Sequence, residues 1–134
     1  MTVDKRVVRF GPFKNAVANA VQAGNIIYLS GQVSVDDAGK FVGINDLEVQ
    51  VRQAYKNIRD VLARLDASLD SVVDETWFVT DMEQLMANFQ LIYAAREKAY
   101  GATPDTTQTL VQVSALAMPE LMVEIKCIAQ IAPQ

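Results

Sequence analysis

The segment LMVEIKCIAQI, Leu121–Ile131, alternates between two kinds of side chain with a period of two. Residues of a strand point in turn to opposite faces, so an apolar residue at every second position predicts a strand with one buried face. The other face carries the two charges of the segment, Glu124 and Lys126. A second run, Thr107–Ser114, predicts the preceding strand, and a loop around Pro119 joins the two.

The N-terminal part of the chain has the pattern of short strands. Apolar residues among charges in Val3–Phe10 predict a first strand, which a Gly-Pro pair ends. Ala16–Gln22 and Ile26–Ser30 flank an Ala-Gly-Asn sequence, so we expect them to form a hairpin. The second hairpin strand should end at Gly31, where the backbone can approach a neighbouring group closely.

Two helices are predicted in the remaining chain, with a strand between them. Leu47–Leu65 carries apolar residues at three- and four-residue steps, which predicts an amphipathic helix of about five turns capped by the preceding Asn-Asp pair. Val72–Thr80 is rich in Val, Thr and aromatic residues and predicts a strand. A second helix should begin after Asp81 and end at Gly101.

These elements predict the α+β class, with two helices packed on one face of a mostly antiparallel sheet. The length of 134 residues suits a single domain that spans residues 1–134. Nothing in so short a chain remains to cover the other face of the sheet. We therefore expect other subunits to cover it, and the 51% content of hydrophobic residues fits a subunit interface.

The composition narrows the classes of function. A net charge of −4, with no basic cluster larger than the Lys5-Arg6 pair, predicts no nucleic-acid partner. The chain has no histidine and a single cysteine, Cys127, so we expect no metal site, no cofactor and no internal disulfide. It has no apolar stretch of the ~20 residues that a membrane helix needs, nor a hydrophobic signal segment, and we expect a cytoplasmic protein without membrane partners.

Six short stretches, in matching order and spacing, resemble the RidA/YjgF family, also called L-PSP. They are AVQAGN at 20–25, IYLSGQ at 27–32, VRQA at 51–54 with NI at 57–58, FVTDM at 78–82, VQV at 111–113 and VEIKCIA at 123–129. The resemblance implies a RidA/chorismate-mutase-like subunit and a homotrimer with a central barrel and ligand clefts between subunits. For the best-characterised branch it implies hydrolysis of enamine and imine intermediates to 2-keto acids and ammonia.

The resemblance also implies site residues. Ser30 and Gly31 match the Ser-Gly-Gln motif of the family, and Glu124 matches the glutamate of its last strand, which would position or activate water. By position alone, Glu124 could instead be a rim residue paired with Lys126 or solvent. The arginine position of the family falls on Gln108, a pocket hydrogen-bonding residue or an ordinary strand residue, or, with another anchor, on Thr106.

Three further positions complete the expected ligand site. The pocket tyrosine of the family falls on Val17 in an ungapped alignment, whereas Phe13 of the Gly-Pro-Phe sequence fits the motif if a gap is allowed. Phe89 lies on the helix that flanks the cleft in the family. Losing the bidentate arginine contact removes about 1.5–3 kcal/mol of charge-assisted binding, so the substrate is uncharged or anchored elsewhere, with Arg96 as a candidate.

Three functions compete at this point. The first is a deaminase or hydrolase of a small enamine or imine metabolite in a cleft between subunits, with Glu124 as the catalytic residue. The second is a non-catalytic or regulatory trimer that binds a small metabolite, because both the arginine and histidine are missing. The third is an RNA-directed activity, against which the acidic net charge argues.

Overall fold

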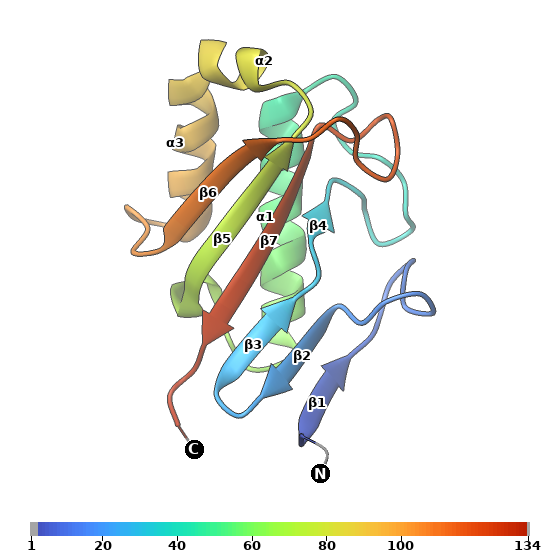
Figure 1. Cartoon of the computed structure of the whole chain (residues 1–134), viewed down its shortest axis with the longest axis vertical. Coiled ribbons are helices and arrows are strands. Elements are labelled where there is room, and N and C mark those ends of the chain that lie inside the picture. The colour runs from blue at the N-terminus through green and yellow to red at the C-terminus, as the bar shows by residue number, and fades with distance from the viewer. Residues whose placement is uncertain (1–2, 134) are drawn as a thin grey trace.

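The computed structural model describes residues 3–133 of the chain. These residues form seven strands and three α-helices (Figure 1). They are β1 Lys5–Val8, β2 Ala20–Ala23, β3 Ile26–Leu29, β4 Gln32–Val33, α1 Leu47–Ala63, the 3₁₀ turn η1 Leu69–Ser71, β5 Val72–Val79, α2 Met82–Ala87, α3 Phe89–Tyr100, β6 Thr107–Gln112 and β7 Val123–Gln130. No helix among the described residues is both long and apolar enough to cross a membrane.

The strands form one sheet in the order β1-β2-β3-β7-β5-β6, and the short strand β4 pairs with β7 just beyond the end of β3. All neighbours are antiparallel except β5 and β6. These two are parallel because the chain between them crosses over through α2 and α3. The predicted mostly antiparallel sheet is confirmed, and β7 lies inside it with neighbours on both sides.

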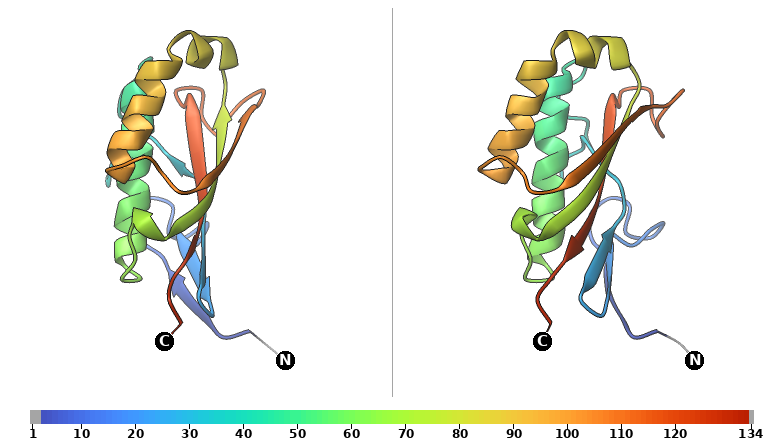
Figure 2. Two further views of the ribbon diagram at one scale, coloured as in Figure 1. Left: turned by 90° about the vertical axis from the view of Figure 1, so that its left-hand side faces the viewer. Right: turned by 60° about the vertical axis from the view of Figure 1, so that its left-hand side comes forward.

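Both views of Figure 2 show the helices on one face of the sheet, as predicted. The alternation of β7 decides which of its faces they cover. Val123, Ile125, Cys127 and Ala129 are all fully buried on the helix side. The residues between them are half-buried or exposed and lie on the open face of the sheet.

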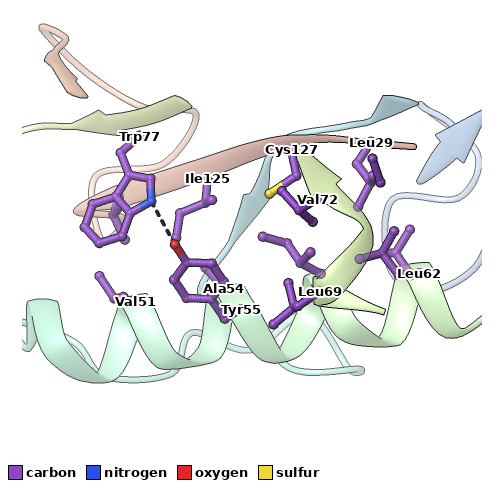
Figure 3. Packing of buried hydrophobic residues seen from close by; sticks show 14 of the residues in the cluster. Leu29, Val51, Ala54, Tyr55, Leu62, Leu69, Val72, Trp77, Ile125 and Cys127 are labelled. Atoms are coloured by element: carbon purple, nitrogen blue, oxygen red, sulfur yellow. Dashed lines mark hydrogen bonds between the residues drawn. The ribbon is translucent and has the colours of Figure 1, made fainter. Parts of the chain in front are cut away.

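Helix α1 supplies most of the core beneath β7. Asp46 caps it, because its carboxylate accepts a hydrogen bond from the Val49 amide at 3.1 Å. Its apolar stripe includes Val51 and Tyr55, and it packs toward β5 and β7 (Figure 3). The Trp77 indole donates a hydrogen bond to the Tyr55 hydroxyl at 3.2 Å, so the largest core side chain leaves no polar group unsatisfied.

The structure corrects three expectations about local structure. The second predicted helix is two helices, because Asn88 leaves the helical conformation and its side chain bonds back to the Gln84 carbonyl. The first hairpin strand begins at Ala20 rather than residue 16, since the amides of residues 16 and 17 both bond to the Phe13 carbonyl in a turn. Beyond Gly31 the chain resumes pairing as β4, which the sequence did not predict.

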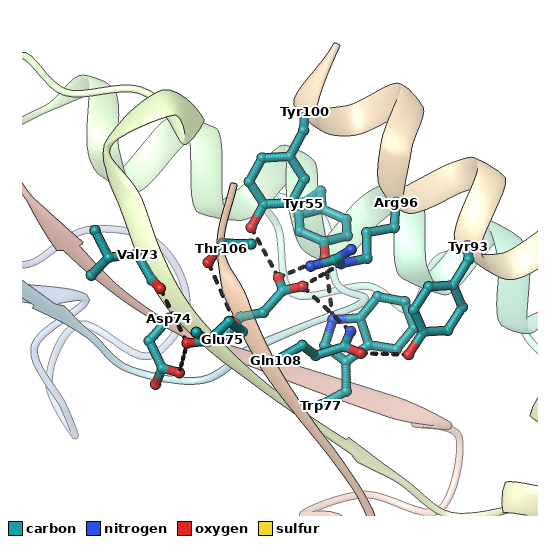
Figure 4. A network of polar contacts seen from close by, with 11 residues as sticks. Tyr55, Val73, Asp74, Glu75, Trp77, Tyr93, Arg96, Tyr100, Thr106 and Gln108 are labelled. Carbon is teal, nitrogen blue, oxygen red and sulfur yellow. Dashed lines mark hydrogen bonds and ion pairs between the residues drawn. The ribbon is translucent and has the colours of Figure 1, made fainter. Parts of the chain in front are cut away.

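A buried carboxylate joins α1, α3, β5 and β6. Glu75 is completely buried and accepts hydrogen bonds from the hydroxyls of Tyr55 at 2.7 Å and Tyr100 at 3.0 Å (Figure 4). It also forms an ion pair with Arg96 and accepts a bond from the Gln108 amide at 3.3 Å. Burial and the nearby Glu75 charge both raise the pKa of Tyr55 and Tyr100, so these hydroxyls stay protonated as donors.

Replacing Arg96 by Met should lower the free energy of unfolding by about 3 kcal/mol, because it leaves the buried Glu75 charge without its cation. Urea-induced unfolding at fixed protein concentration measures this change. Lys56→Met is the matched control, since Lys56 pairs with Asp60 at 3.3 Å on an exposed helix face. That variant should lose at most about 0.5 kcal/mol. Equal losses in the two variants would contradict a structural role for the buried pair.

Candidate functional site

The six predicted site residues fall into two groups, separated by the central strands of the sheet. The first group consists of Val17, Ser30, Gly31 and Glu124, around the β3–β4 junction and the start of β7. The second group consists of Phe89 and Gln108, on α3 and on the edge strand β6. Strand β5 lies between β7, which carries Glu124, and β6, which carries Gln108, so one described subunit does not bring all six together.

Gly31 and Glu124 are in direct contact. A Cβ atom on Gly31 would lie 2.6 Å from the Cδ of Glu124 and 2.8 Å from its Cγ. Any other residue at position 31 would therefore collide with the carboxylate in its present place. The break between β3 and β4 occurs at this glycine, and the absence of a side chain there leaves room for the Glu124 carboxylate.

Glu124 differs from the other site residues in that its side-chain polar atoms have no partner within the described part of the chain. It is half-buried, and among residues 3–133 its side chain makes no hydrogen bond or ion pair. Burial raises its pKa above that of an ordinary glutamate, and the charge of Lys126 offsets part of this rise. A carboxylate with a raised pKa and free oxygens can bind water and accept a proton from it.

Ser30 holds the neighbouring loop in place. Its hydroxyl donates to the Ala18 carbonyl at 2.6 Å, and its amide donates to the Asn19 carbonyl at 3.0 Å. The loop before them carries Phe13 and Val17, which are 42% and 50% exposed. Both residues line a crevice, and both are candidates for the tyrosine position of the family. The structure thus places the two alternative alignments on the same surface.

The crevice has an apolar wall and an acidic end. Its lining residues are Phe10–Phe13, Val17, Asn19, Ser30–Val33, Val35–Asp37, Asn57, Asp60 and Val61. Glu124 is not among them, but its side chain lies against Gly31, which is. Asp36 uses its carboxylate to hold the following turn, and Asp60 pairs with Lys56. Two of the acidic side chains at this end, Asp36 and Asp60, are therefore already engaged by groups of the chain itself.

Gln108 points to the helix side of the sheet and is occupied by protein groups. Its amide donates to Glu75, and its carbonyl accepts a hydrogen bond from the Tyr93 hydroxyl. Tyr93 in turn stacks on Phe89, with ring centroids 4.3 Å apart. The two residues of the second group are thus connected through a tyrosine that the sequence analysis did not select.

Arg96 is also committed within the chain. It forms an ion pair with Glu75, and only 12% of its side chain is exposed. As a replacement for the missing arginine it would have to leave a buried carboxylate. The sequence analysis missed Glu75 itself, although Glu75, Trp77 and Val79 share one face of β5. A charge at that position on an otherwise apolar face was the available signal.

The sequence matches the family model described as Endoribonuclease L-PSP over residues 8–131. It is similar to the RutC family protein YjgH of Escherichia coli, with 33% identity over 115 residues, 86% of this chain and 82% of that protein. It is also similar to the chloroplastic Reactive Intermediate Deaminase A of Arabidopsis thaliana, with 30% identity over 130 residues. That match covers 96% of this chain and 64% of the plant protein.

Solved structures show the same likeness in three dimensions. YyfA of Yersinia pestis, a protein of the conserved Rid family, superposes with a TM-score of 0.82 and 30% identity, over 96% of this chain and 100% of the other. Rv2704 of Mycobacterium tuberculosis, a member of the YjgF/YER057c/UK114 family, superposes with a TM-score of 0.77 and 27% identity, over 96% of this chain and 100% of the other.

The contact between Gly31 and Glu124 predicts a thermodynamic coupling. Gly31→Ala should lower the free energy of unfolding by about 1–2 kcal/mol, because the new methyl group displaces the carboxylate. In a Glu124→Ala background the same change should cost little, since the colliding atoms are gone and Gly31 has no left-handed φ to favour glycine. A double-mutant cycle by urea unfolding measures the difference. Equal costs in both backgrounds would disprove the contact.

The raised pKa of Glu124 predicts a pH-dependent stability difference. A group whose pKa is higher in the folded protein favours folding when protonated, and that contribution is lost as pH rises through the folded pKa. Glu124→Gln should therefore have a higher Tm than the parent at pH 7. The gap should close below about pH 4.3, the ordinary glutamate pKa, where both states are protonated. Exposed Glu97→Gln is the control, and a gap independent of pH would contradict the prediction.

Proposed function

Because this chain belongs to the endoribonuclease L-PSP family, the RidA/YjgF family that its sequence resembles, we propose that it hydrolyses small enamine or imine metabolites. In this reaction water adds to the carbon of a C=N bond, and the resulting carbinolamine breaks its C–N bond. The products are a carbonyl compound and ammonia, and no electrons are transferred. An enamine enters the same sequence once it has taken a proton on carbon to become the imine.

One observation carries this proposal: Glu124 is half-buried, has no hydrogen-bond or ion-pair partner among the described residues, and lies against the Gly31 backbone. A carboxylate with these properties accepts a proton from the attacking water and returns it to the departing nitrogen. Burial raises the pKa of Glu124, which makes it a stronger base than an ordinary glutamate. Histidine, the usual residue for this work, is absent from the chain.

We further propose that the reaction takes place between subunits of a homotrimer. The first group and Phe89, which is 43% exposed, lie on different parts of the subunit, as they would if the first group of one subunit faced Phe89 of its neighbour. The open face of the sheet supports assembly, because an apolar row crosses four strands on it. The row consists of Val7, Val21, Tyr28 and Ile128, and Val7 and Tyr28 are 49% and 48% exposed.

Glu124→Gln should lower the turnover of a hydrolysable imine at least about 100-fold, because glutamine cannot accept the proton of water. Ammonia release from a panel of 2-iminopropanoate and uncharged imines measures this loss. Glu97→Gln, on the exposed face of α3, is the matched control and should keep parental turnover. Light scattering should show three subunits per particle in all of these proteins.

The parent protein and the variant each offer an outcome that would overturn the proposal. Unchanged turnover in Glu124→Gln would remove Glu124 from the mechanism. If the parent protein accelerates no imine but is thermally stabilised by a small keto or imino acid, a metabolite-binding protein replaces the enzyme as the conclusion. If the protein is a monomer in solution, a reaction in a cleft between subunits is ruled out.

A further inference from the structure

The proposed reaction needs a group that holds the substrate beside Glu124, and the cation expected from the resemblance is missing. Arg96 does not fill the place, because it pairs with buried Glu75. Its guanidinium also lies between two aromatic rings, 5.8 Å from the centroid of Tyr93 and 5.6 Å from that of Tyr100. The charge of this arginine is therefore already paired within the fold and is not available to a substrate.

Lys126 lies on the same face of β7 as Glu124, two residues further along the strand. Two residues of a strand span about 6.6 Å, so the two side chains are neighbours on the open face. The Lys126 ammonium donates to the Leu29 carbonyl at 3.1 Å. Continuing the pairing of β3 with β7 by two residues places Lys126 beside Ser30, and the next residue is the glycine that contacts Glu124.

The Lys126 ammonium keeps binding capacity for a ligand. An ammonium has three donors, and the Leu29 carbonyl takes one of them. The three ion pairs formed by described side chains involve Arg52, Lys56 and Arg96, and Lys126 is in none of them. In the single subunit its side chain is exposed, on the same face of the sheet as Glu124.

On the basis of the proposed function, we infer that Lys126 supplies the positive charge that binds the carboxylate of an imino acid beside Glu124. Charge and proton transfer are then divided between two residues of one strand: the ammonium holds the acid group, and the glutamate directs water to the adjacent C=N carbon. An ammonium is a compact point charge on a flexible stem, so it does not need the fork geometry of arginine. The loss of arginine at position 108 then leaves the substrate class unchanged.

The test compares a charged and an uncharged substrate in matched variants. Lys126→Met should lower kcat/KM for 2-iminopropanoate about 10- to 100-fold, mainly through KM, because one charge-assisted contact is lost. At a pH above the acid limb of the pH profile, it should leave kcat/KM for propan-2-imine, which has no carboxylate, within twofold of the parent. Lys126→Arg should recover most of the activity on 2-iminopropanoate. Lys98→Met, an exposed lysine on α3, is the control and should affect neither substrate.

Two further readouts separate this inference from the proposed function. Binding of pyruvate, the product, should weaken about 10-fold or more in Lys126→Met by calorimetry, whether or not the protein turns over. The acid limb of the pH profile for propan-2-imine should move to higher pH, since Lys126 holds down the pKa of Glu124. Pyruvate binding that depends on Lys126, in a protein that turns over no imine, would support Lys126 as the carboxylate-binding residue and refute the proposed enzymatic activity.

Several results would overturn the inference that Lys126 binds the carboxylate. Equal losses on the two imines in Lys126→Met would show a structural effect, and unchanged KM for 2-iminopropanoate with unchanged pyruvate binding would show no contact. A loss confined to 2-iminopropanoate in Arg96→Met, with Lys126→Met unaffected, would assign the carboxylate to Arg96. Absence of pyruvate binding and of activity on 2-iminopropanoate in the parent would also exclude the inference.

Discussion

The two-sided alternation of β7 is the constraint on which the structure depends. One side of this strand is buried against the helices, and the other carries Glu124 and Lys126 on the open face of the sheet. A shift of one residue in its pairing would bury both charges and expose the core residues, so the hydrophobic pattern fixes the register strongly. Because β7 is an inner strand with β3 and β4 on one side and β5 on the other, the same register positions Glu124 against Gly31.

The second constraint is the buried charge of Glu75. A carboxylate with no exposed surface is tolerated because an arginine, two tyrosines and an amide surround it, and these groups come from α1, α3 and β6. Helix α3 buries only Ile92 and Ala95 completely, so this polar cluster supplies much of what fastens it to the sheet. The same cluster occupies Arg96 and Gln108, which removes the two groups that sequence comparison offers for substrate binding.

Glu75 and Glu124 show how one fold uses the same side chain in opposite ways. Glu75 has four donors around it and no access to solvent, which suits a structural charge. Glu124 has no protein donor among the described residues and is half open to solvent, which suits a group that must bind and release water. Partial burial, which the charge of Lys126 offsets only in part, raises its pKa and costs stability, as is common at functional sites.

Much of the architecture follows from the local pattern of the sequence. The period of two in 121–131, the helical period in 47–65 and the turn residues between strands specify the element types, and the structure confirms the α+β arrangement with helices on one face. Boundaries were less predictable: Asn88 divides a helix because its side chain competes for the backbone of the preceding turn. The pairing of β4 with β7 depends on residues about 90 positions apart, which no local pattern reveals.

The sequence by itself determined which residues alternate, which family motifs are present and which charged groups lie on the open face of the last strand. Only the tertiary structure decided that Gly31 makes room for the Glu124 carboxylate, that Gln108 faces inward, and that Arg96 is neutralised by Glu75. The physical reason is that periodicity encodes the direction of a side chain relative to its own strand or helix. Whether a charge meets a partner depends on side chains that the fold brings together from distant parts of the chain.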